Sequence, residues 1–199
     1  MRYKKDHKKE THARIVSMAN RRFRERGFSK TAIPKVMGDA GLTHGGFYAH
    51  FASKNALIGE SIEQAFRDSI AMLFAKLDGL DLGTQWAKIV HRYLHERHRD
   101  SLAEGCLMPA LSGEVARMNP DQRRLYEEGL KAFVAVLERY VPGVDGEPRE
   151  KRAIALLASL VGGVLLSRAV VDKAYSDRIL EACRTFALAE THSTPPNPA

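Results

Sequence analysis

The chain has 199 residues, of which 44% are hydrophobic and 28% charged, the composition of an ordinary soluble protein with one or two domains. Its two cysteines are too few for a disulfide framework, which favours a reducing compartment. The net charge of +7 is uneven, because residues 1–54 hold 13 Lys and Arg against 4 Asp and Glu, whereas the rest hold 18 against 20. This imbalance predicts a polyanion-binding head on a near-neutral body, with a merely solvated basic tail as the alternative.

Neither the N-terminus nor the most apolar segment predicts a membrane protein. The N-terminal sequence RYKKDHKKE lacks the apolar stretch of a signal peptide. Residues 153–167 are uncharged, but this segment is shorter than the about 20 apolar residues that a membrane span needs. We therefore expect a buried helix there, no membrane partner and a cytoplasmic location.

Helical periodicity, without strand alternation or internal repeats, predicts an all-α fold of about nine helices. The first helix is expected over residues 9–26, with Gly27 just past its end. Thr31 suits the N-cap of a short second helix, and Pro34 falls in its first turn, where a missing N–H is harmless. Gly41 can take the positive φ of a tight turn before the third helix.

The remaining elements follow from caps and breaks. Thr43 can cap the third helix, 44–51, and Ser53 can cap a long fourth helix that runs to about Leu77. Later helices are expected after Gly83, over 105–118, from Asn119 to about Tyr140, over 149–172 and over 176–190. The expected organisation is a DNA-binding domain over 1–52, a helical ligand-binding and dimerisation domain over 53–190 and a disordered tail over 191–199.

Residues 31–54, TAIPKVMGDAGLTHGGFYAHFASK, carry the strongest functional pattern. Two short helices around the Gly41 turn have the arrangement of a helix-turn-helix, whose second helix enters the DNA major groove. The predicted contacts are Thr43, His44, Gly45 and Gly46 to base edges, with Tyr48, His50 and Lys54 on phosphates. The two glycines weaken the helix by about 1 kcal/mol each against Ala, which a close approach to DNA would justify. The alternative is a glycine-rich helix start beside ordinary core aromatics.

The order T-x-I-x-x-V-x-x-x-A-G-L-T-x-G-x-F-Y-x-H-F-x-S-K resembles the DNA-binding domain of the TetR family of bacterial transcriptional regulators, over about residues 10–57. The resemblance implies a homodimer on a palindromic operator of double-stranded DNA, and it adds Thr31 to the phosphate contacts. Ala32 and Pro34 stand where a hydroxyl and a polar DNA-contacting residue are common, and Gly46 stands where many relatives have Thr. We therefore expect DNA shape and backbone contacts to contribute more to sequence recognition, and direct contacts with bases to contribute less.

The apolar segment near residue 160 offers a pairing face. Ala155, Ala158, Ser159, Gly162 and Gly163 place small residues at spacings of three and four. Together with the last helix, such a face can pair across a two-fold axis as a four-helix bundle. The alternative is a core helix that packs only within its own chain.

The middle of the chain holds candidate sensor residues. Cys106 follows Gly105 near an expected helix N-terminus, where the helix dipole can lower a thiol pKa. Similar G-C-L-x-x-x-L-x-x-E stretches occur in a TetR subgroup, some members of which sense electrophiles through cysteine. The alternative is a small buried hydrophobe. The residues that could line an apolar effector cavity are Trp86, Met108, Leu111 and Tyr126, together with Met72 and Phe133.

The sequence contains little that indicates a metal site or a catalytic site. His91, His95 and His98 have the spacing of one helical face, but no Cys or carboxylate motif accompanies them. No cofactor or metal is predicted.

Taken together, these patterns predict a homodimeric repressor that a small apolar ligand or cysteine modification releases from its operator. Two alternatives remain: a helical thiol-dependent enzyme using Cys106, and a non-specific DNA-binding protein.

Overall fold

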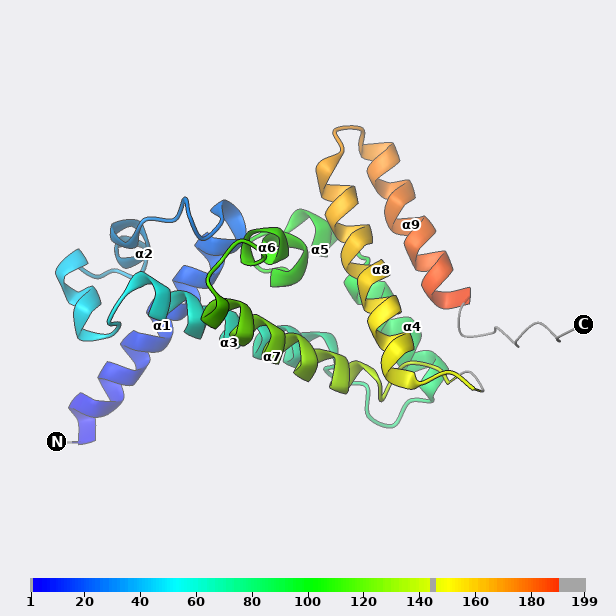
Figure 1. Cartoon of the computed structure of the whole chain (residues 1–199), viewed down its shortest axis with the longest axis horizontal. Helices are drawn as coiled ribbons and strands as arrows, with labels where there is room; N and C mark the ends of the chain where they lie inside the picture. Colours follow the sequence, from blue (N-terminus) through cyan, green and yellow to red (C-terminus); the bar gives the residue numbers. More distant parts are fainter. Residues whose placement is uncertain (1, 144–145, 190–199) are drawn as a thin grey trace, which may run out of the picture. The chain divides into compact units, whose positions relative to one another are not determined.

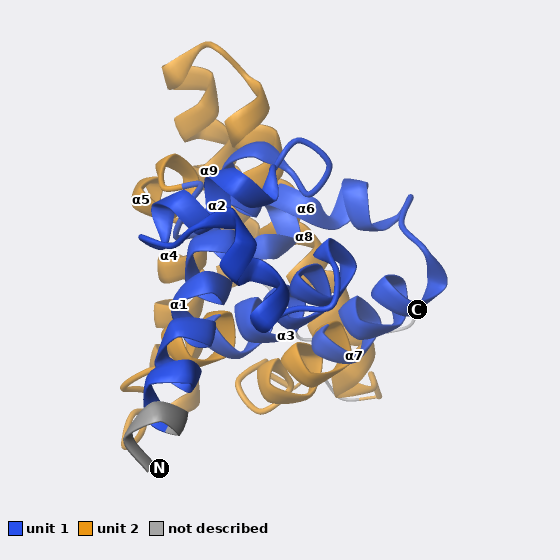
Figure 2. Ribbon diagram, turned by 90° about the vertical axis from the view of Figure 1, so that its left-hand side faces the viewer, with its two compact units in different colours: residues 1–68, 102–129 blue, residues 69–101, 130–199 orange. Residues whose placement is uncertain are grey.

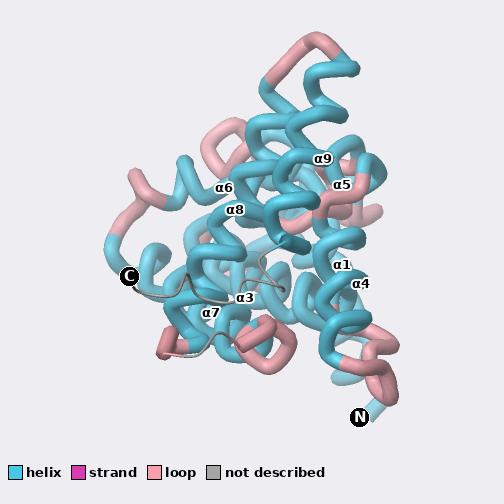
Figure 3. The backbone as a smooth tube through the Cα atoms, turned by 90° about the vertical axis from the view of Figure 1, so that its right-hand side faces the viewer, coloured by secondary structure: helices cyan, strands magenta, loops and turns pink. Residues whose placement is uncertain are grey.

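The computed structural model describes residues 2–143 and 146–189, with side chains from residue 6 onward. Across these residues it contains nine α-helices and one 3-10 helix, and no strand (Figures 1 and 3). The expected all-α class is therefore confirmed. The expected disordered tail, 191–199, lies outside the described residues.

The helices form two compact units (Figure 2). Unit 1 comprises residues 1–68 and 102–129, and unit 2 comprises residues 69–101 and 130–199. Two of the three boundaries fall within long helices, α3 (Lys54–Leu73) and α7 (Pro120–Leu137), and the third falls between residues 101 and 102. The predicted boundary at residue 52 separates a DNA-binding domain from a ligand-binding domain by function, not by compact packing. It stays a prediction.

Unit 1 packs around the first helix. Its elements are α1 (Arg2–Arg26), α2 (Ile33–Asp39), the 3-10 helix η1 (His44–Ala49), the first part of α3, α6 (Leu107–Val115) and the first part of α7. Ile15, Ala19 and Phe23 follow one another at intervals of four residues along one face of α1, and all three are fully buried. Phe28 tilts against Phe23 at 4.9 Å between ring centroids, so the core continues into the α1–α2 turn.

Local turn and cap chemistry follows the sequence closely. Gly27 and Gly41 have φ of +84° and +71°, the left-handed conformation expected of both. The backbone N–H of Ala56 donates to Ser53 Oγ at 3.1 Å, so Ser53 caps α3 as predicted. Asn119 caps α7 in the same way, by accepting from the N–H of Gln122 at 3.0 Å, while the two side-chain amides bond at 3.1 Å.

Two expectations in this unit are wrong. The N-cap of α2 is Ala32, without a side-chain cap, whereas Thr31 is buried and its hydroxyl donates to the carbonyl oxygen of Gly27 at 2.7 Å. The third helix is a 3-10 helix that ends at Ala49, not an α-helix that reaches Phe51. Two consecutive glycines disfavour the α-helix by about 1 kcal/mol each, and a short 3-10 helix tolerates them better.

Unit 2 contains α4 (Leu82–Tyr93), α5 (Glu96–Asp100), α8 (Arg149–Ala169), α9 (Lys173–Ala189) and the remaining parts of α3 and α7. Helices α8 and α9 run side by side as a hairpin (Figure 1). Trp86 on α4 is fully buried, and its indole N–H donates to the carbonyl oxygen of Ala187 at 2.9 Å. The α4 helix is thereby fixed to the α8–α9 hairpin.

The segment between α4 and α5 corrects the histidine prediction. The helix ends at Tyr93, and His95 caps α5 by accepting from the N–H of Arg97 at 3.0 Å. His91 and His98 therefore do not share a helical face with it. Burial lowers the pKa of His98, whose Nδ1 lies 2.6 Å from the carbonyl oxygen of Tyr93. No cluster of three metal-ligating side chains occurs among the residues with described positions.

Helix α8 contains the apolar segment considered as a membrane span. It has 21 residues and a mean hydropathy of 1.5 over its most apolar window, so its length and composition alone would allow a span. The core helix of a soluble protein passes the same test. In this structure α8 contacts α9, α5 and α4, with Leu156, Leu160 and Val164 buried, as expected of a helix inside unit 2.

Candidate DNA-binding surface and sensor region

The predicted base-reading residues lie together on one exposed turn. Thr43, His44 and Gly45 are exposed and Gly46 is half-buried, at the beginning of η1. On the inner side, Phe47 of η1 and Phe51, two residues after its end, are buried and stack at 5.5 Å between ring centroids. The aromatic pair therefore fixes η1 to the core of unit 1.

The predicted phosphate contacts differ in accessibility. Tyr48 is 68% exposed, so its hydroxyl is available to a ligand. Lys54 is half-buried and donates to the carbonyl oxygen of Ser29 at 3.4 Å. The hydroxyl of Thr31 is directed inward, towards the carbonyl oxygens of Gly27 and Arg22. The contact of Thr31 with a phosphate stays a prediction. In this conformation only the backbone of Thr31 could make that contact.

His50 sits between η1 and α1. Burial, and then the nearby charges of His12 and Lys8, lower the pKa of His50 below its usual 6.5. Its Nδ1 is buried without a hydrogen-bond partner among the described residues. At neutral pH His50 is therefore uncharged, and it would contact a phosphate as an N–H donor rather than as a cation.

An ion-pair network holds α2 against α1. The guanidinium of Arg22 and the ammonium of Lys35 both bind the carboxylate of Asp39, the latter at 2.9 Å. The hydrogen bonds from Arg22 and then Lys35 lower the pKa of Asp39 to about 2. Because Asp39 is the last residue of α2, this network sets the angle at which the chain enters the Gly41 turn.

Glu114, which the sequence did not single out as a functional residue, binds the α1–α2 turn. Its carboxylate accepts from the backbone N–H of Phe28 at 2.5 Å, from that of Ser29 at 3.2 Å and from the Ser29 hydroxyl at 2.8 Å. Gly27 leaves room for it, since a Cβ there would lie 3.0 Å from both carboxylate oxygens. The end of α6 is thereby tied to the turn that precedes the helix-turn-helix.

Cys106 lies at the other end of α6. It lies near the helix N-terminus, as predicted, but as the N-cap residue just before the helix, and it is only 2% exposed. The Arg24 side chain, whose Nε donates to the carbonyl oxygen of Ala103 at 2.7 Å, interacts electrostatically with Cys106. Burial lowers the pKa of Arg24. Cys106 is therefore a buried thiol at a helix N-terminus with a guanidinium nearby, an arrangement that fits a packed cysteine as well as a sensor.

The predicted effector-lining residues divide between the two units. Met108 and Leu111 are buried in unit 1, where the Tyr126 hydroxyl lies 2.5 Å from Ser112 Oγ. Trp86 is buried in unit 2, whereas Met72 is 58% exposed, which does not suit a buried lining residue. A shallow polar pocket in unit 2 contains none of these residues; it is lined by Glu96, Asp177, Arg178, Leu180, Glu181 and Arg184.

The small-residue segment of α8 presents two different faces. Gly162 has no atom within 4 Å of the position of a Cβ, and Ala155 and Ala158 are exposed. Gly163 instead faces inward, because a Cβ there would lie 2.9 Å from Cys183 Sγ and 3.0 Å from Leu94. Its assignment to the outward pairing face is therefore wrong. The large apolar side chains exposed on α8 and α9 are Ile154, Leu165, Leu166, Tyr175 and Phe186.

The sequence matches known regulators over the region just described. Residues 15–60 match the family described as "Bacterial regulatory proteins, tetR family". The HTH-type transcriptional repressor DhaR of Mycobacterium sp. strain GP1 is 26% identical over 60% of this chain, which spans 61% of DhaR. The uncharacterized HTH-type transcriptional regulator Rv0196 of Mycobacterium tuberculosis H37Rv is 26% identical over 89% of this chain and 94% of its own length.

Solved structures share the whole fold. The reduced form of Escherichia coli NemR has a TM-score of 0.75 and 21% identity, covering 96% of this chain and 99% of NemR. A TetR transcriptional regulator from Chloroflexus aurantiacus has a TM-score of 0.77 and 21% identity, covering 98% of both chains. These structures show the fold; the tetR-family match over residues 15–60, its exposed helix-turn-helix and the curated regulators identify the chain as a TetR-family transcriptional regulator.

Proposed function

We propose that this protein is a homodimeric repressor, cytoplasmic and without enzymatic activity, which leaves a palindromic operator when an apolar effector binds or Cys106 is modified. The observation that carries the DNA-binding part is the exposed turn of η1. Thr43, His44 and Gly45 stand outward while Phe47 fixes the element from within. The similarity to a repressor, DhaR, supports the sign of regulation.

The exposed face of the α8–α9 hairpin supports the dimer. Leu165 and Leu166 on α8 and Tyr175 and Phe186 on α9 are each about half exposed, and an apolar stripe of this kind marks an interaction surface. The exposed Ala155 and Ala158 and the open space beside Gly162 would let a second copy approach α8 closely. Two copies related by a two-fold axis would present two η1 elements to adjacent major grooves, about 34–36 Å apart.

The first test is selection of binding sites from random DNA by the purified protein. We expect a palindrome with half-sites about one helical turn apart. His44→Ala should weaken binding to the selected duplex by about 1–3 kcal/mol and relax the preference at one position of each half-site, because an exposed side chain on this turn reads a base edge. Fluorescence anisotropy with the selected duplex and single-base variants measures both effects.

A matched control is His91→Ala, which removes an exposed histidine from α4. It should leave affinity and base preference unchanged. Binding without any selected sequence would reject the specific regulator in favour of the non-specific DNA-binding alternative. Turnover of a substrate that depends on Cys106 would instead favour the thiol-dependent enzyme.

The proposed switch runs along α6 within unit 1. Cys106 stands at its N-cap, and Glu114, which binds the α1–α2 turn, stands in its last turn. Eight residues of α-helix separate them by about 12 Å. A displacement at the Cys106 end would therefore shift or rotate the carboxylate away from the N–H groups of Phe28 and Ser29. An effector that binds beside Met108 and Leu111 would move the same helix.

Covalent modification would act through the packing of Cys106. The thiol loses its proton, its sulfur adds to the β-carbon of an unsaturated carbonyl compound, and the α-carbon takes a proton, so that a thioether forms. Because Cys106 is almost fully buried, the adduct cannot fit without movement of the chain around Gly105 and the start of α6. The adduct would thus stabilise a conformation that binds the operator less well.

Cys106→Ser is expected to keep DNA binding but to resist release. N-ethylmaleimide should weaken binding of the parent to the selected duplex by about fivefold or more, whereas the variant should be unaffected. Cys183→Ser is the matched control. Burial raises the pKa of Cys183, and this thiol lies on α9, which is not part of the α6 route, so its replacement should leave the release intact. Equal release of the Cys106→Ser variant and the parent would reject cysteine sensing and leave the reversible effector.

A further inference from the structure

The beginning of α1 is a basic helical segment outside the matched helix-turn-helix region. The helix starts at Arg2, whereas the family match starts at residue 15. Residues 2–9 contain five Lys and Arg against one acid, Asp6. Residues 6–10 are all exposed, and Thr11 is the first buried residue among the described side chains. Packing therefore does not explain this part of the helix.

The charges also oppose the helix dipole. No acidic residue stands in the first turn of α1, where the sequence is basic. Positive charge near the N-terminal end of a helix is unfavourable. An external polyanion would offset this unfavourable energy. Residues 6–10, the exposed residues at this end of α1 with described side chains, contain no apolar side chain and so offer no apolar anchor to a protein partner.

The segment continues from the predicted phosphate contacts of η1. His12 stacks on Phe51 at 4.4 Å and lies 5.8 Å from His50, measured between ring centroids. Lys8 precedes His12 by four residues and therefore lies one turn away on the same face of α1. Its charge contributes to the lowered pKa of His50, after burial and His12. The exposed lysines of α1 thus begin near His50, one of the predicted phosphate contacts.

We propose that the first turns of α1 form a second DNA-contacting segment, in which Lys8 and Lys9 bind backbone phosphates that flank the half-site contacted by η1. The proposal rests on the proposed DNA-binding function and enlarges its footprint. The part of the helix before Thr11 extends about 14 Å, which corresponds to about four base pairs. Contacts to phosphates add affinity without base preference.

The test compares Lys8→Gln/Lys9→Gln with the parent on a selected duplex and on an unselected duplex of the same length. For every phosphate that the variant no longer binds, the slope of log K against log salt should fall by about 0.9, while the selected sequence stays the same. Lys8→Arg/Lys9→Arg should restore the slope. The control Lys88→Gln/Lys151→Gln removes the same charge from exposed positions in unit 2 and should leave the slope unchanged.

A second measurement shortens the DNA. Removing about four base pairs beyond each half-site should weaken binding of the parent but not of the Lys8→Gln/Lys9→Gln variant. A slope equal to that of the control variant, or equal sensitivity of parent and variant to the shortened duplex, would overturn the proposal. A parent that selects no sequence would reject the proposed function instead, and the slope on the unselected duplex would still decide whether α1 binds phosphates.

Discussion

Gly129→Ala is expected to lower the free energy of unfolding by about 1–3 kcal/mol, the range for overpacking a buried contact. A Cβ at this position of α7 would lie 2.2 Å from Cδ2 and 2.7 Å from Cε2 of the Phe66 ring. Phe66 is buried and meets Tyr126 edge-to-face at 5.2 Å between ring centroids, so the ring cannot move away freely. The clash outweighs the roughly 1 kcal/mol that Ala contributes to helix propensity.

The matched control is Gly113→Ala on α6, in the same unit. No atom lies within 4 Å of a Cβ at Gly113, so the substitution should stabilise the protein by up to about 1 kcal/mol. For a chain of this length, each kcal/mol changes the melting temperature by about 2–4 °C. Thermal unfolding followed by circular dichroism would separate the two variants. Equal melting temperatures for both would contradict the close contact of α7 with Phe66.

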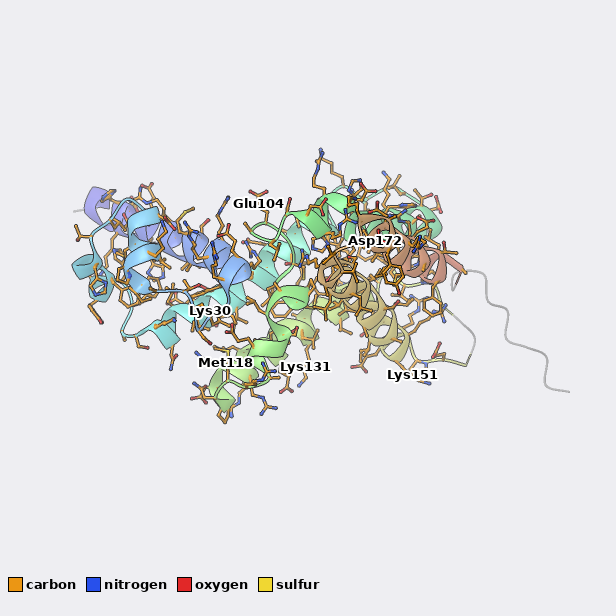
Figure 4. All side chains as sticks on the ribbon, turned by 90° about the horizontal axis from the view of Figure 1, so that it is seen from above. Lys30, Glu104, Met118, Lys131, Lys151 and Asp172 are labelled. Carbon is orange, nitrogen blue, oxygen red and sulfur yellow. The ribbon has the colours of Figure 1, made fainter. Side chains whose placement is uncertain are left out.

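The second large effect concerns Glu114. Glu114→Ala is expected to destabilise the protein by about 1–3 kcal/mol, because the buried N–H of Phe28 loses its acceptor. Glu104→Ala is the matched control. Its carboxylate pairs with Arg21 at 3.2 Å on the surface, and such pairs contribute about 0–1 kcal/mol. Figure 4 labels Glu104. It also labels Lys30, the residue after Ser29 in the turn that Glu114 binds.

The pH dependence provides an independent check. Burial raises the pKa of Glu114, but hydrogen bonds from Ser29 and from the backbone N–H of Phe28 outweigh burial and lower it below 4.5. Its contribution is therefore present above the pKa of the unfolded chain, about 4.3, and is lost as the pH falls through the lower folded-state pKa. Urea denaturation from pH 6 to about pH 3 should show a smaller loss for Glu114→Gln than for the parent. Parallel curves would contradict the carboxylate contact.

Variants of Glu114 also distinguish a purely structural role of this residue from a role in transmitting the signal from Cys106. If α6 transmits the modification of Cys106, Glu114→Ala should bind the selected duplex less tightly than the parent and lose less of that affinity with N-ethylmaleimide. Glu104→Ala should respond as the parent does. A full response of Glu114→Ala to the reagent would mean that the signal leaves Cys106 by another route.

Local features of the fold were predictable because their causes are close in the chain. The Ser53 and Asn119 caps and the positive φ of Gly27 and Gly41 depend on residues within a few positions. Errors arose where two local preferences competed. Thr31 had the chemistry of a cap, but its hydroxyl found a carbonyl acceptor in the preceding turn.

Long-range features were not predictable. The carboxylate of Glu114 reaches the N–H of Phe28 across 86 positions in the chain, and no periodicity relates the two residues. Gly162 and Gly163 are adjacent in α8 and cannot be told apart by their sequence context. Gly163 nevertheless packs against Cys183, whereas no atom lies within 4 Å of a Cβ position at Gly162. The break of α4 before His95 likewise separated histidines whose spacing suggested one face.

The sequence by itself determined the all-α class, the helix-turn-helix and the residues exposed on it, because helix periodicity, caps and turn glycines act over one or two turns of chain. Only the tertiary structure decided which side chains connect these elements: the Glu114 contact with the α1–α2 turn, the burial of Cys106 beside Arg24 and the inward direction of Gly163. Such contacts depend on the packing of distant helices, whose geometry no local pattern encodes.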